Sequence, residues 1–208
     1  MSSLFDASEQ NNLEQAKPLA ARMRPTTLEE FVGQQHFLGE GKLLRKLLKA
    51  DRLGSVIFFG PPGCGKTTLA RLLATESSHR FVQLSAVTSG VKDLREVLEY
   101  ARHDLAAGGE KTLLFIDEIH RLNRVVEEVL YSAMEDFFLS WVVGKGLSAR
   151  NVNLRINPFT LVGATTRFSL ISAPLRDRFG SVFRLDYYDQ TDMEVVVSRS
   201  AEILATKA

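Results

Sequence analysis

The run from Gly60 to Thr67 reads GPPGCGKT and matches the phosphate-binding pattern G-x-x-x-x-G-K-[ST]. It follows an apolar run over residues 55–59 and precedes a segment with helical spacing over residues 67–75. Glycines let backbone N–H groups approach phosphate oxygens, and the first turn of a helix adds a favourable dipole. In this pattern Lys66 reaches the β- and γ-phosphates, and Thr67 ligates Mg²⁺. The sequence therefore predicts an ATP and Mg²⁺ site formed by Gly60, Gly63, Cys64, Gly65, Lys66 and Thr67.

Two acids, Asp117 and Glu118, directly follow an apolar run over residues 113–116. An acid at the carboxyl end of a parallel strand beside the phosphate loop is the expected second Mg²⁺ contact, which assigns that role to Asp117. Glu118 can then orient and deprotonate the attacking water, a role that a protein binding ATP without hydrolysing it does not need. A solvated acidic turn is the alternative. His120 follows closely, and we expect a surface or packing histidine there.

Further polar side chains follow at a later strand end. Thr165 and Thr166 come after the apolar run 159–164, where a hydroxyl can sense the γ-phosphate and hold the attacking water; a simple turn is the alternative. Beyond them, Arg176 and Arg178 flank an acid at the end of a short helix. Such an arginine can act in trans, as an arginine finger that adds positive charge to a neighbouring subunit's transition state. A salt-bridged surface explains the same residues equally well.

These residues need a framework that brings strand ends together. The apolar runs are continuous rather than alternating, and helical segments separate them, which is typical of a parallel sheet covered on both faces. The predicted fold class is therefore α/β, with strands at 55–59, 81–84, 113–116, 159–164 and 182–185. Helices are expected at 41–49, 67–75, 92–107, 125–134 and 192–204. A threonine before Leu28 also fits a helix N-cap with an acidic first turn.

One segment interrupts this alternation. Residues 137–157, approximately, read as a β-hairpin, because the return arm alternates apolar with polar residues. A hairpin inserted in an α/β domain usually projects from it. Residues 1–17 are rich in Ser, Gln, Asn and Glu and are expected to be a disordered tail. This leaves residues 18–208 as one globular domain.

The composition limits the possible function classes. The chain has 208 residues, of which 45% are hydrophobic, and a formal net charge of +1, so it can bury a core but has no global basic field for nucleic acid. Its one cysteine, Cys64, excludes a disulfide framework and indicates a reducing compartment. At this variable loop position we expect a small filler rather than a redox switch. No run of about 20 apolar residues and no secretory signal are evident, so we expect a cytoplasmic protein without membrane contact.

Taken in order, the motifs GPPGCGKTT, LLFIDEIHR, GATT and PLRDRFG resemble those of AAA+ ATPases of DNA recombination and repair, over nearly all of residues 18–208. Residues 18–111 resemble RarA, a replication-associated recombination ATPase, in the stretches PLAARMRP, GQQHFLG and SAVTSGVKDLRE. Residues 112–208 resemble RuvB, the Holliday junction branch-migration ATPase, in DEIHRLNRVVEEVLYSAMEDF, VVGKGLSARNV and FTLVGATTRFSLISAPLRDRFG. The changeover leads to the hypothesis of a hybrid of two related genes, which separate phylogenies of the two parts would test.

The resemblance implies a P-loop AAA+ large domain and a role for each matching position. Thr166 corresponds to the γ-phosphate sensor and Arg178 to the arginine finger, and with Glu118 they form the expected catalytic set. The positions matching nucleotide contacts are Met23 and Arg24 at the base, Gly63, Lys66, Thr67 and Thr68 at the phosphates, and Glu135, Asp136, Phe137 and Tyr188 along the site.

The same resemblance implies partners. A RuvB-like chain is expected to form a homo-oligomeric ring, a hexamer, that acts on four-way junction DNA in the bacterial cytoplasm and nucleoid. The hairpin, over residues 139–156, matches the element that docks on the junction-binding protein RuvA. Trp141 and Val143 are candidate apolar contacts there, and a packed hairpin arm is the alternative.

The expected function is thus an ATP-hydrolysing motor subunit for branch migration. Both families continue into a helical lid domain, which we expect to be absent from this sequence, so hydrolysis by the chain alone is an open question. A RarA-like factor at stalled replication forks is one alternative. A non-catalytic nucleotide-binding module, or a truncated remnant, is the other.

Overall fold

The structure is a computed structural model that describes residues 18–106, 108–143 and 150–205. The chain divides into two compact units. The larger, which we call the sheet unit, is Gln34–Tyr187, and the smaller, the terminal unit, combines Met1–Gly33 with Tyr188–Ala208. The expected tail over residues 1–17 lies outside the described residues, and the single domain over residues 18–208 stays a prediction.

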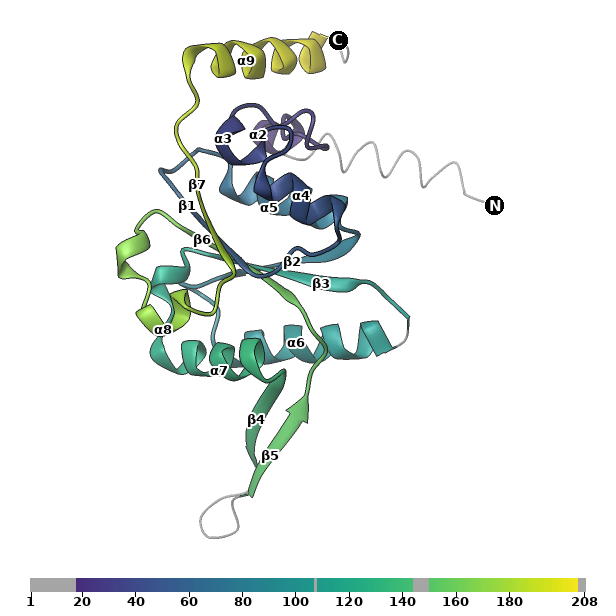
Figure 1. Cartoon of the computed structure of the whole chain (residues 1–208), viewed down its shortest axis with the longest axis vertical. Coiled ribbons are helices and arrows are strands. Elements are labelled where there is room, and N and C mark those ends of the chain that lie inside the picture. Colours follow the sequence, from purple (N-terminus) through teal and green to yellow (C-terminus); the bar gives the residue numbers. More distant parts are fainter. Residues whose placement is uncertain (1–17, 107, 144–149, 206–208) are drawn as a thin grey trace. The chain divides into compact units, whose positions relative to one another are not determined.

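A parallel sheet of five strands forms the centre of the sheet unit, in the order β2-β3-β6-β1-β7 (Figure 1). Because all neighbours are parallel, the carboxyl ends of the strands meet at one edge of the sheet. The strands are β1 (Val56–Phe59), β2 (His79–Ser85), β3 (Lys111–Asp117), β6 (Thr160–Thr165) and β7 (Ser181–Arg184). The predicted α/β fold with a parallel sheet is confirmed, and each expected strand is present with small shifts at its ends.

The continuous apolar runs in the sequence are the strands buried on both faces. Every residue of β6 is buried, and so is β3 from Thr112 to Ile116. At Gly163 the central strand has no side chain, and a Cβ added there would lie 2.7 Å from Ile119 Cδ1. Ile119 begins the 3₁₀ turn η1 (Ile119–Arg121), which directly follows β3 and its turn residue Glu118. This close approach fixes the end of β3 against β6.

Helices cover both faces of the sheet. In Figure 1, α4 and α5 lie on one face, and α6 and α7 lie on the other. On the second face Leu94, Leu98 and Leu130 are at most 1% exposed and belong to the main core cluster.

Among the described helices, none combines the length and apolar character needed to cross a membrane. The helices are α3 (Gln35–Leu38), α4 (Leu43–Lys49), α5 (Lys66–Glu76), α6 (Val91–Ala106), α7 (Arg124–Glu135) and α8 (Ala173–Arg176), with a second 3₁₀ turn, η3 (Phe168–Leu170).

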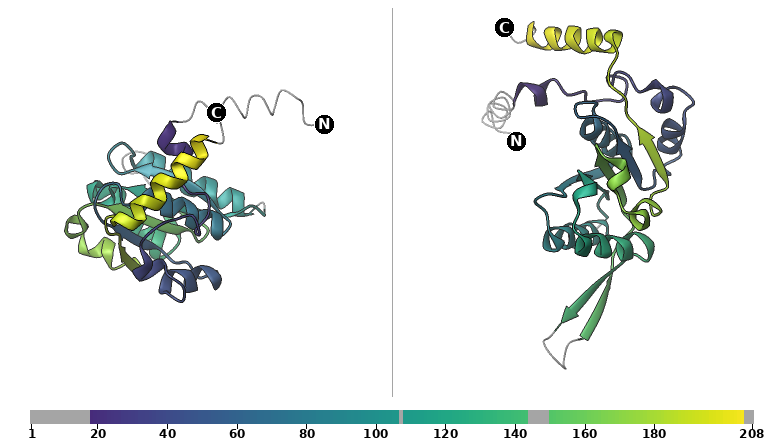
Figure 2. Two further views of the ribbon diagram at one scale, coloured as in Figure 1. Left: turned by 90° about the horizontal axis from the view of Figure 1, so that it is seen from above. Right: turned by 90° about the vertical axis from the view of Figure 1, so that its left-hand side faces the viewer.

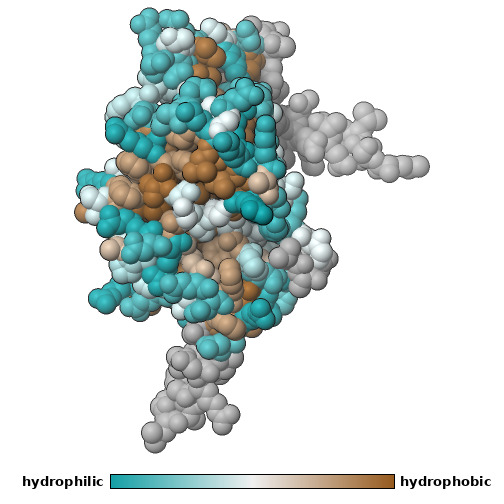
Figure 3. Space-filling model, viewed as in Figure 1, coloured by the Kyte–Doolittle hydropathy of each residue, from teal (hydrophilic) through white to brown (hydrophobic). Residues whose placement is uncertain are grey.

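Apolar side chains also reach the surface of the sheet unit. Figure 3 shows apolar surface on the face of this unit that is turned to the viewer. Leu43 on α4 is 53% exposed, and Val182 on the edge strand β7 is 42% exposed. Scattered exposure of this kind is ordinary, since folded proteins do not have enough polar atoms to cover their surfaces.

The expected hairpin is present as an insertion between α7 and β6. Strands β4 (Phe138–Val143) and β5 (Arg150–Arg155) pair antiparallel, and Figures 1 and 2 show them pointing away from the sheet. At the base of the hairpin Leu139 and Ile156 are buried in the main core cluster. The connecting residues 144–149 lie outside the described residues.

The terminal unit contains α2 (Leu19–Arg22) and α9 (Gln190–Ala205). The helical turn expected after the threonines is wrong, because residues 26–30 form bends. Thr27 Oγ1 does accept a hydrogen bond from Glu30 N, at 3.4 Å. Only a few residues separate this cap from Gly33, whose φ of +81° is left-handed. A helix here would therefore gain too few backbone hydrogen bonds to offset the cost of nucleation.

Glu30 connects this bend to α9. Its carboxylate accepts a hydrogen bond from Thr26 N at 2.7 Å and pairs with Arg199 Nη2 at 2.7 Å. The Thr26 backbone bond, with further help from Arg199, holds the pKa of Glu30 below its ordinary value despite partial desolvation. Because the folded-state pKa is lowered, this contribution to stability is present above the ordinary pKa and is lost as the pH falls through the folded-state pKa.

Replacing Gly163 with Ala should lower the free energy of unfolding by about 1–3 kcal/mol, because the new Cβ overlaps Ile119 Cδ1 inside a filled core. Denaturant unfolding measures this change. Adding Ile119→Val, which removes Cδ1, should recover part of the loss. Gly54→Ala is the matched control: a Cβ there meets no atom within 4 Å, so its effect should stay within about 0.5 kcal/mol. Equal effects at the two glycines would contradict the close approach.

Candidate functional site

The phosphate-binding loop connects the end of β1 to the start of α5. Gly63 and Gly65 have φ values of +79° and +92°, in the left-handed region where a Cβ would be strained. Gly65 is the N-cap of α5, so the unpaired N–H groups of the first helical turn face the loop. Thr67 and Thr68 lie half-buried in this first turn. The backbone thus presents hydrogen-bond donors of the kind that bind phosphate.

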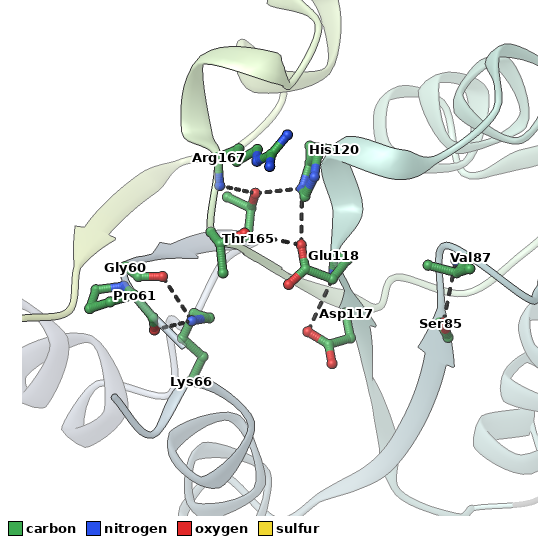
Figure 4. A network of polar contacts seen from close by, with 11 residues as sticks. Gly60, Pro61, Lys66, Ser85, Val87, Asp117, Glu118, His120, Thr165 and Arg167 are labelled. Atoms are coloured by element: carbon green, nitrogen blue, oxygen red, sulfur yellow. Dashed lines mark hydrogen bonds and ion pairs between the residues drawn. The ribbon is translucent and has the colours of Figure 1, made fainter. Parts of the chain in front are cut away.

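Lys66 folds back over this loop. Only 8% of the residue is exposed, and Nζ donates to Gly60 O at 2.9 Å and to Pro61 O at 2.7 Å (Figure 4). Cys64 is buried with its Sγ 3.7 Å from Nζ, a position that suits a small filler. A phosphate oxygen that binds Lys66 therefore competes with two carbonyl oxygens.

The chain turns sharply where β3 ends. Glu118 has φ 52° and ψ 43°, a left-handed conformation that residues other than glycine adopt rarely. Asp117 Oδ1 accepts a hydrogen bond from Glu118 N at 3.0 Å, which stabilises the turn. In the view of Figure 4, Asp117 and Lys66 face the same region from two sides. Backbone strain of this kind is concentrated at functional sites.

Glu118 joins a chain of polar contacts across the ends of β3 and β6 (Figure 4). Its Oε2 lies 3.2 Å from His120 Nδ1 and accepts a hydrogen bond from the Thr166 hydroxyl at 3.4 Å. His120 Nδ1 also lies 2.8 Å from Thr165 Oγ1, which accepts a bond from Arg167 N at 2.9 Å. The structure therefore brings together the predicted base, Glu118, and the predicted sensor, Thr166.

His120 is a member of this cluster that sequence reasoning did not include. Its side chain is 8% exposed and lies between polar partners, instead of at the surface or in apolar packing. One partner, Glu118, is close in sequence, but Thr165 is 45 residues away. The sequence feature that could have identified His120 is its place just after the acid pair, in a chain that also has two threonines at another strand end.

The predicted arginine finger lies in a second polar cluster, formed by α7 and α8. Arg178 Nη2 pairs with Glu135 Oε1 at 2.8 Å, and Nη1 donates to Pro174 O. The guanidinium carbon lies 4.3 Å from the centre of the Tyr131 ring, within the range of a cation–π contact. The Arg178 side chain is 20% exposed. Two predicted site residues, Arg178 and Glu135, are thus neighbours.

The hydroxyl of Tyr131 is held by two residues, Glu127 and Ser172, that were not predicted as site residues. Its hydroxyl donates to Glu127 Oε2 at 2.7 Å, and Ser172 Oγ donates to the same oxygen at 2.9 Å. Burial raises the pKa of Tyr131, opposed by the Ser172 hydrogen bond, so the phenol stays protonated and able to donate. The ring under Arg178 therefore has a fixed orientation.

The other predicted contacts lie in several places. Asp136 and Phe137 directly follow α7, and Phe137 has a left-handed φ of 55°. Met23, Arg24 and Tyr188 belong to the terminal unit, and their predicted contact with the nucleotide stays a prediction.

The candidate hairpin contacts are on β4. Trp141 lies in register with Val152, and Val143 with Arg150. Their role in docking a partner stays a prediction.

The residues available for a metal ion fit Mg²⁺ shared with phosphates. Thr67 and Asp117 supply a hydroxyl and a carboxylate, the hard oxygen donors that this ion prefers, and Mg²⁺ usually keeps several waters. Within the described ranges, no group of three or more His, Cys, Asp or Glu side chains could hold an ion unaided. The donor set therefore suits an ion whose remaining ligands are water and substrate.

Comparison with known proteins adds family evidence to this geometry. Residues 23–185 match the family model described as "Holliday junction DNA helicase RuvB P-loop domain". The chain is 44% identical over 187 residues to the Holliday junction branch migration complex subunit RuvB of Staphylococcus haemolyticus, covering 89% of this chain and 55% of that protein. For the RuvB subunit of Fervidobacterium nodosum the identity is 41% over 187 residues, covering 88% of this chain and 52% of the relative.

Solved structures agree. The Thermotoga maritima RuvB Holliday junction branch migration motor superposes with a TM-score of 0.69 at 37% identity, over 88% of this chain and 55% of that chain. A mutant of the same RuvB gives a TM-score of 0.70 at 38% identity, with 88% and 56% coverage. The chain thus spans about half the length of the relatives it matches.

These matches also bear on the expected hybrid. The family match extends on both sides of the changeover at residues 111–112. Similarity of residues 18–111 to RarA is not shown, and the hypothesis of two parental families finds no support in a match that is continuous across the boundary. The matched residues include the phosphate-binding loop, the acid pair and Arg178, and the chain belongs to the RuvB P-loop domain family of AAA+ ATPases.

Proposed function

We propose that this chain is the ATP-binding and hydrolysing part of a RuvB-type Holliday junction branch migration motor. The carrying observation is the position of Glu118 at the end of β3, hydrogen-bonded at 3.4 Å to Thr166 at the end of β6. The phosphate-binding loop leaves β1, the neighbour of β6 on its other side. Base, sensor and loop therefore meet at one edge of the sheet. A module that only binds ATP needs no positioned base there.

The loop binds the substrate phosphates. Backbone N–H groups of the first turn of α5 and the Lys66 ammonium supply the donors, with Lys66 exchanging its two carbonyl partners for phosphate oxygens. Thr67 and Asp117 would hold Mg²⁺, which would neutralise charge that develops on the phosphates. The left-handed turn after Asp117 separates the two acids, so one is free for the ion and the other for the water.

Glu118 then acts as the general base. Its carboxylate accepts a proton from the attacking water while the water oxygen forms a bond to the γ-phosphorus. The bond between the γ-phosphorus and the β,γ-bridging oxygen breaks, and ADP leaves with that oxygen. The Thr166 hydroxyl donates to Glu118 Oε2 and lies where it can also bond to the γ-phosphate or to the attacking water.

Arg178 supplies positive charge to a neighbouring subunit. Its partners here, Glu135, Tyr131 and Pro174, all come from α7 and α8 of its own chain, where the side chain is held at the surface with 20% exposure. A guanidinium fixed in this way is oriented before it meets a neighbour's phosphate. This favours a ring of identical subunits, which we propose to be a hexamer.

The proposed partners follow from the function of the relatives. They are subunits of a Holliday junction branch migration complex, so the proposed DNA substrate is a four-way junction in the bacterial cytoplasm. The hairpin β4–β5 points away from the sheet and is the proposed docking element for a RuvA-like partner. The chain has a net charge of only +1, which leaves the DNA contact to other parts of such an assembly.

The Glu118→Gln variant should lose ATP hydrolysis by at least about 100-fold while it retains ATP binding, because the amide cannot accept the proton of the water. Steady-state hydrolysis and nucleotide titration measure the two properties. Lys66→Ala should lose binding as well. Glu110→Gln is the control, since this exposed acid precedes the same strand at its other end. If the unmodified chain binds ATP but neither hydrolyses it nor responds to Glu118→Gln, the chain is a binding module.

The trans role of Arg178 is tested by mixing two inactive variants. Arg178→Ala should reduce hydrolysis by at least about 1,000-fold if it is an arginine finger. In an equal mixture with Glu118→Gln, about a quarter of the interfaces should become active. At these interfaces the Glu118→Gln subunit supplies an intact Arg178 to the intact Glu118 of an Arg178→Ala subunit. Gel filtration confirms that the variants assemble together. No recovery in a mixed assembly would place Arg178 in its own subunit's site or outside catalysis.

The docking role of the hairpin predicts that Trp141→Ala weakens binding to a RuvA protein at least about tenfold, because interface tryptophans carry a large share of binding energy. Calorimetry measures the change, and circular dichroism checks the fold. Val125→Ala on α7 removes a 60% exposed apolar side chain outside the hairpin and serves as the control. Equal affinity of the two variants would remove the hairpin from the interface.

A further inference from the structure

His120 occupies a position that the reaction described above does not use. It lies on η1, two residues after Glu118, with 8% of its side chain exposed. Its Nδ1 lies 2.8 Å from Thr165 Oγ1 and 3.2 Å from Glu118 Oε2, so one ring nitrogen contacts residues from two strand ends (Figure 4). Filling space in the core would not require a buried imidazole with these two polar contacts.

The hydrogen-bonding capacities of the partners decide which tautomer fits. An ionised carboxylate oxygen only accepts, so Glu118 Oε2 gains from the contact only when His120 Nδ1 carries a proton. Thr165 Oγ1 has two lone pairs: one accepts from Arg167 N at 2.9 Å, and the other can accept from the same Nδ1–H. An unprotonated Nδ1 would leave a lone pair 3.2 Å from the carboxylate oxygen with no proton between the two atoms. The geometry therefore calls for His120 with Nδ1–H.

The same contacts divide the two oxygens of Glu118. Oε2 receives the His120 ring and the Thr166 hydroxyl. The Glu118 side chain is 32% exposed, so the group is still open to solvent. Two contacts at one oxygen reduce the orientations open to the carboxylate, and its second oxygen can accept from a water. Because misplacing a catalytic group by about 1 Å can reduce the rate by a factor of about 100, such a restraint has kinetic value.

We propose that His120 is a positioning residue that holds Glu118 by Oε2, leaves Oε1 for the attacking water, and ties this arrangement to the Thr165–Thr166 end of β6. The inference rests on the proposed function, because it assigns Glu118 the role of base. His120 touches neither nucleotide nor water in this role. It acts through Glu118, and its link to Thr165 means that the position of the base depends on the strand that carries the sensor.

Two substitutions separate positioning from packing. Asn places an N–H donor close to where His presents Nδ1–H, whereas Leu fills a similar space without a donor. We expect His120→Leu to lower kcat for ATP hydrolysis at least about tenfold with KM and nucleotide affinity unchanged, and His120→Asn to recover most of that loss. A packing role predicts the reverse order, with Leu tolerated better than Asn. Faster hydrolysis by His120→Leu would also overturn the proposal, since it would mean that His120 restrains the base from acting.

A double variant provides the control for general damage. In the Glu118→Gln background the base is already lost, so adding His120→Leu should reduce kcat no further. If the second change still lowers the rate by its full factor, His120 acts independently of Glu118 and the proposal fails.

The tautomer gives a readout that does not depend on hydrolysis. Nitrogen-15 NMR of histidine-labelled full chain distinguishes protonated from unprotonated ring nitrogens, and comparison with His120→Asn identifies the His120 signals. We expect a protonated Nδ1 that changes in the Glu118→Gln variant. An unprotonated Nδ1 overturns the contact even in an active protein. Absence of hydrolysis by the unmodified chain would instead refute the proposed function, and the NMR result would still decide the His120 contact.

Discussion

Ile119 occupies the space that Gly163 leaves in the middle of β6, and this contact holds the end of β3 against the central strand. Its neighbours in sequence then have little freedom. Glu118 must take a left-handed conformation, which costs about 1–3 kcal/mol for such a residue. Full burial of an isoleucine side chain contributes about 1.5–3 kcal/mol, so core packing is large enough to sustain the strained turn. The polar contacts of Glu118 and His120 with β6 depend on this apolar contact beneath them.

The sequence predicted the elements well because their signals are local. Continuous apolar runs such as residues 113–116 identify strands buried on both faces. The glycine pattern of the loop by itself predicts phosphate binding. The bend at Thr27 shows the limit of a local signal, since its capping bond forms but no helix follows. The distant partners of His120 and Tyr131 could not be predicted from the sequence for another reason. Thr165 is 45 residues from His120, and Ser172 is 41 residues from Tyr131, so only the fold brings them together.

The two polar clusters differ in what surrounds them. The Glu118 cluster joins ends of parallel strands, which are fixed by sheet hydrogen bonds on both sides. The Arg178 cluster joins α7 to α8 and the residues just after it. It is held by one ion pair, the hydrogen bond to Pro174 O, one ring contact and the hydrogen bonds of the Tyr131 hydroxyl. An ion pair whose acid is 53% exposed contributes little to stability, at most about 1 kcal/mol. Its more important effect is to limit the orientations of a long side chain, which lowers the entropy lost when the guanidinium binds an external anion.

Both cations of the proposed mechanism already have acceptors within the protein. Lys66 bonds to two carbonyl oxygens of its own loop, and Arg178 pairs with Glu135. Phosphate binding is therefore an exchange of partners, and its free energy is the difference between two sets of charge-assisted bonds rather than the sum of the new ones. For Lys66 the exchange favours phosphate, because neutral carbonyls are replaced by a strongly charged anion. For Arg178 one anion replaces another, so the gain is smaller and depends on geometry. In the proposed trans role, an arginine balanced in this way binds a neighbour's phosphate only when that phosphate is correctly placed, so the exchange would be selective for an assembled site.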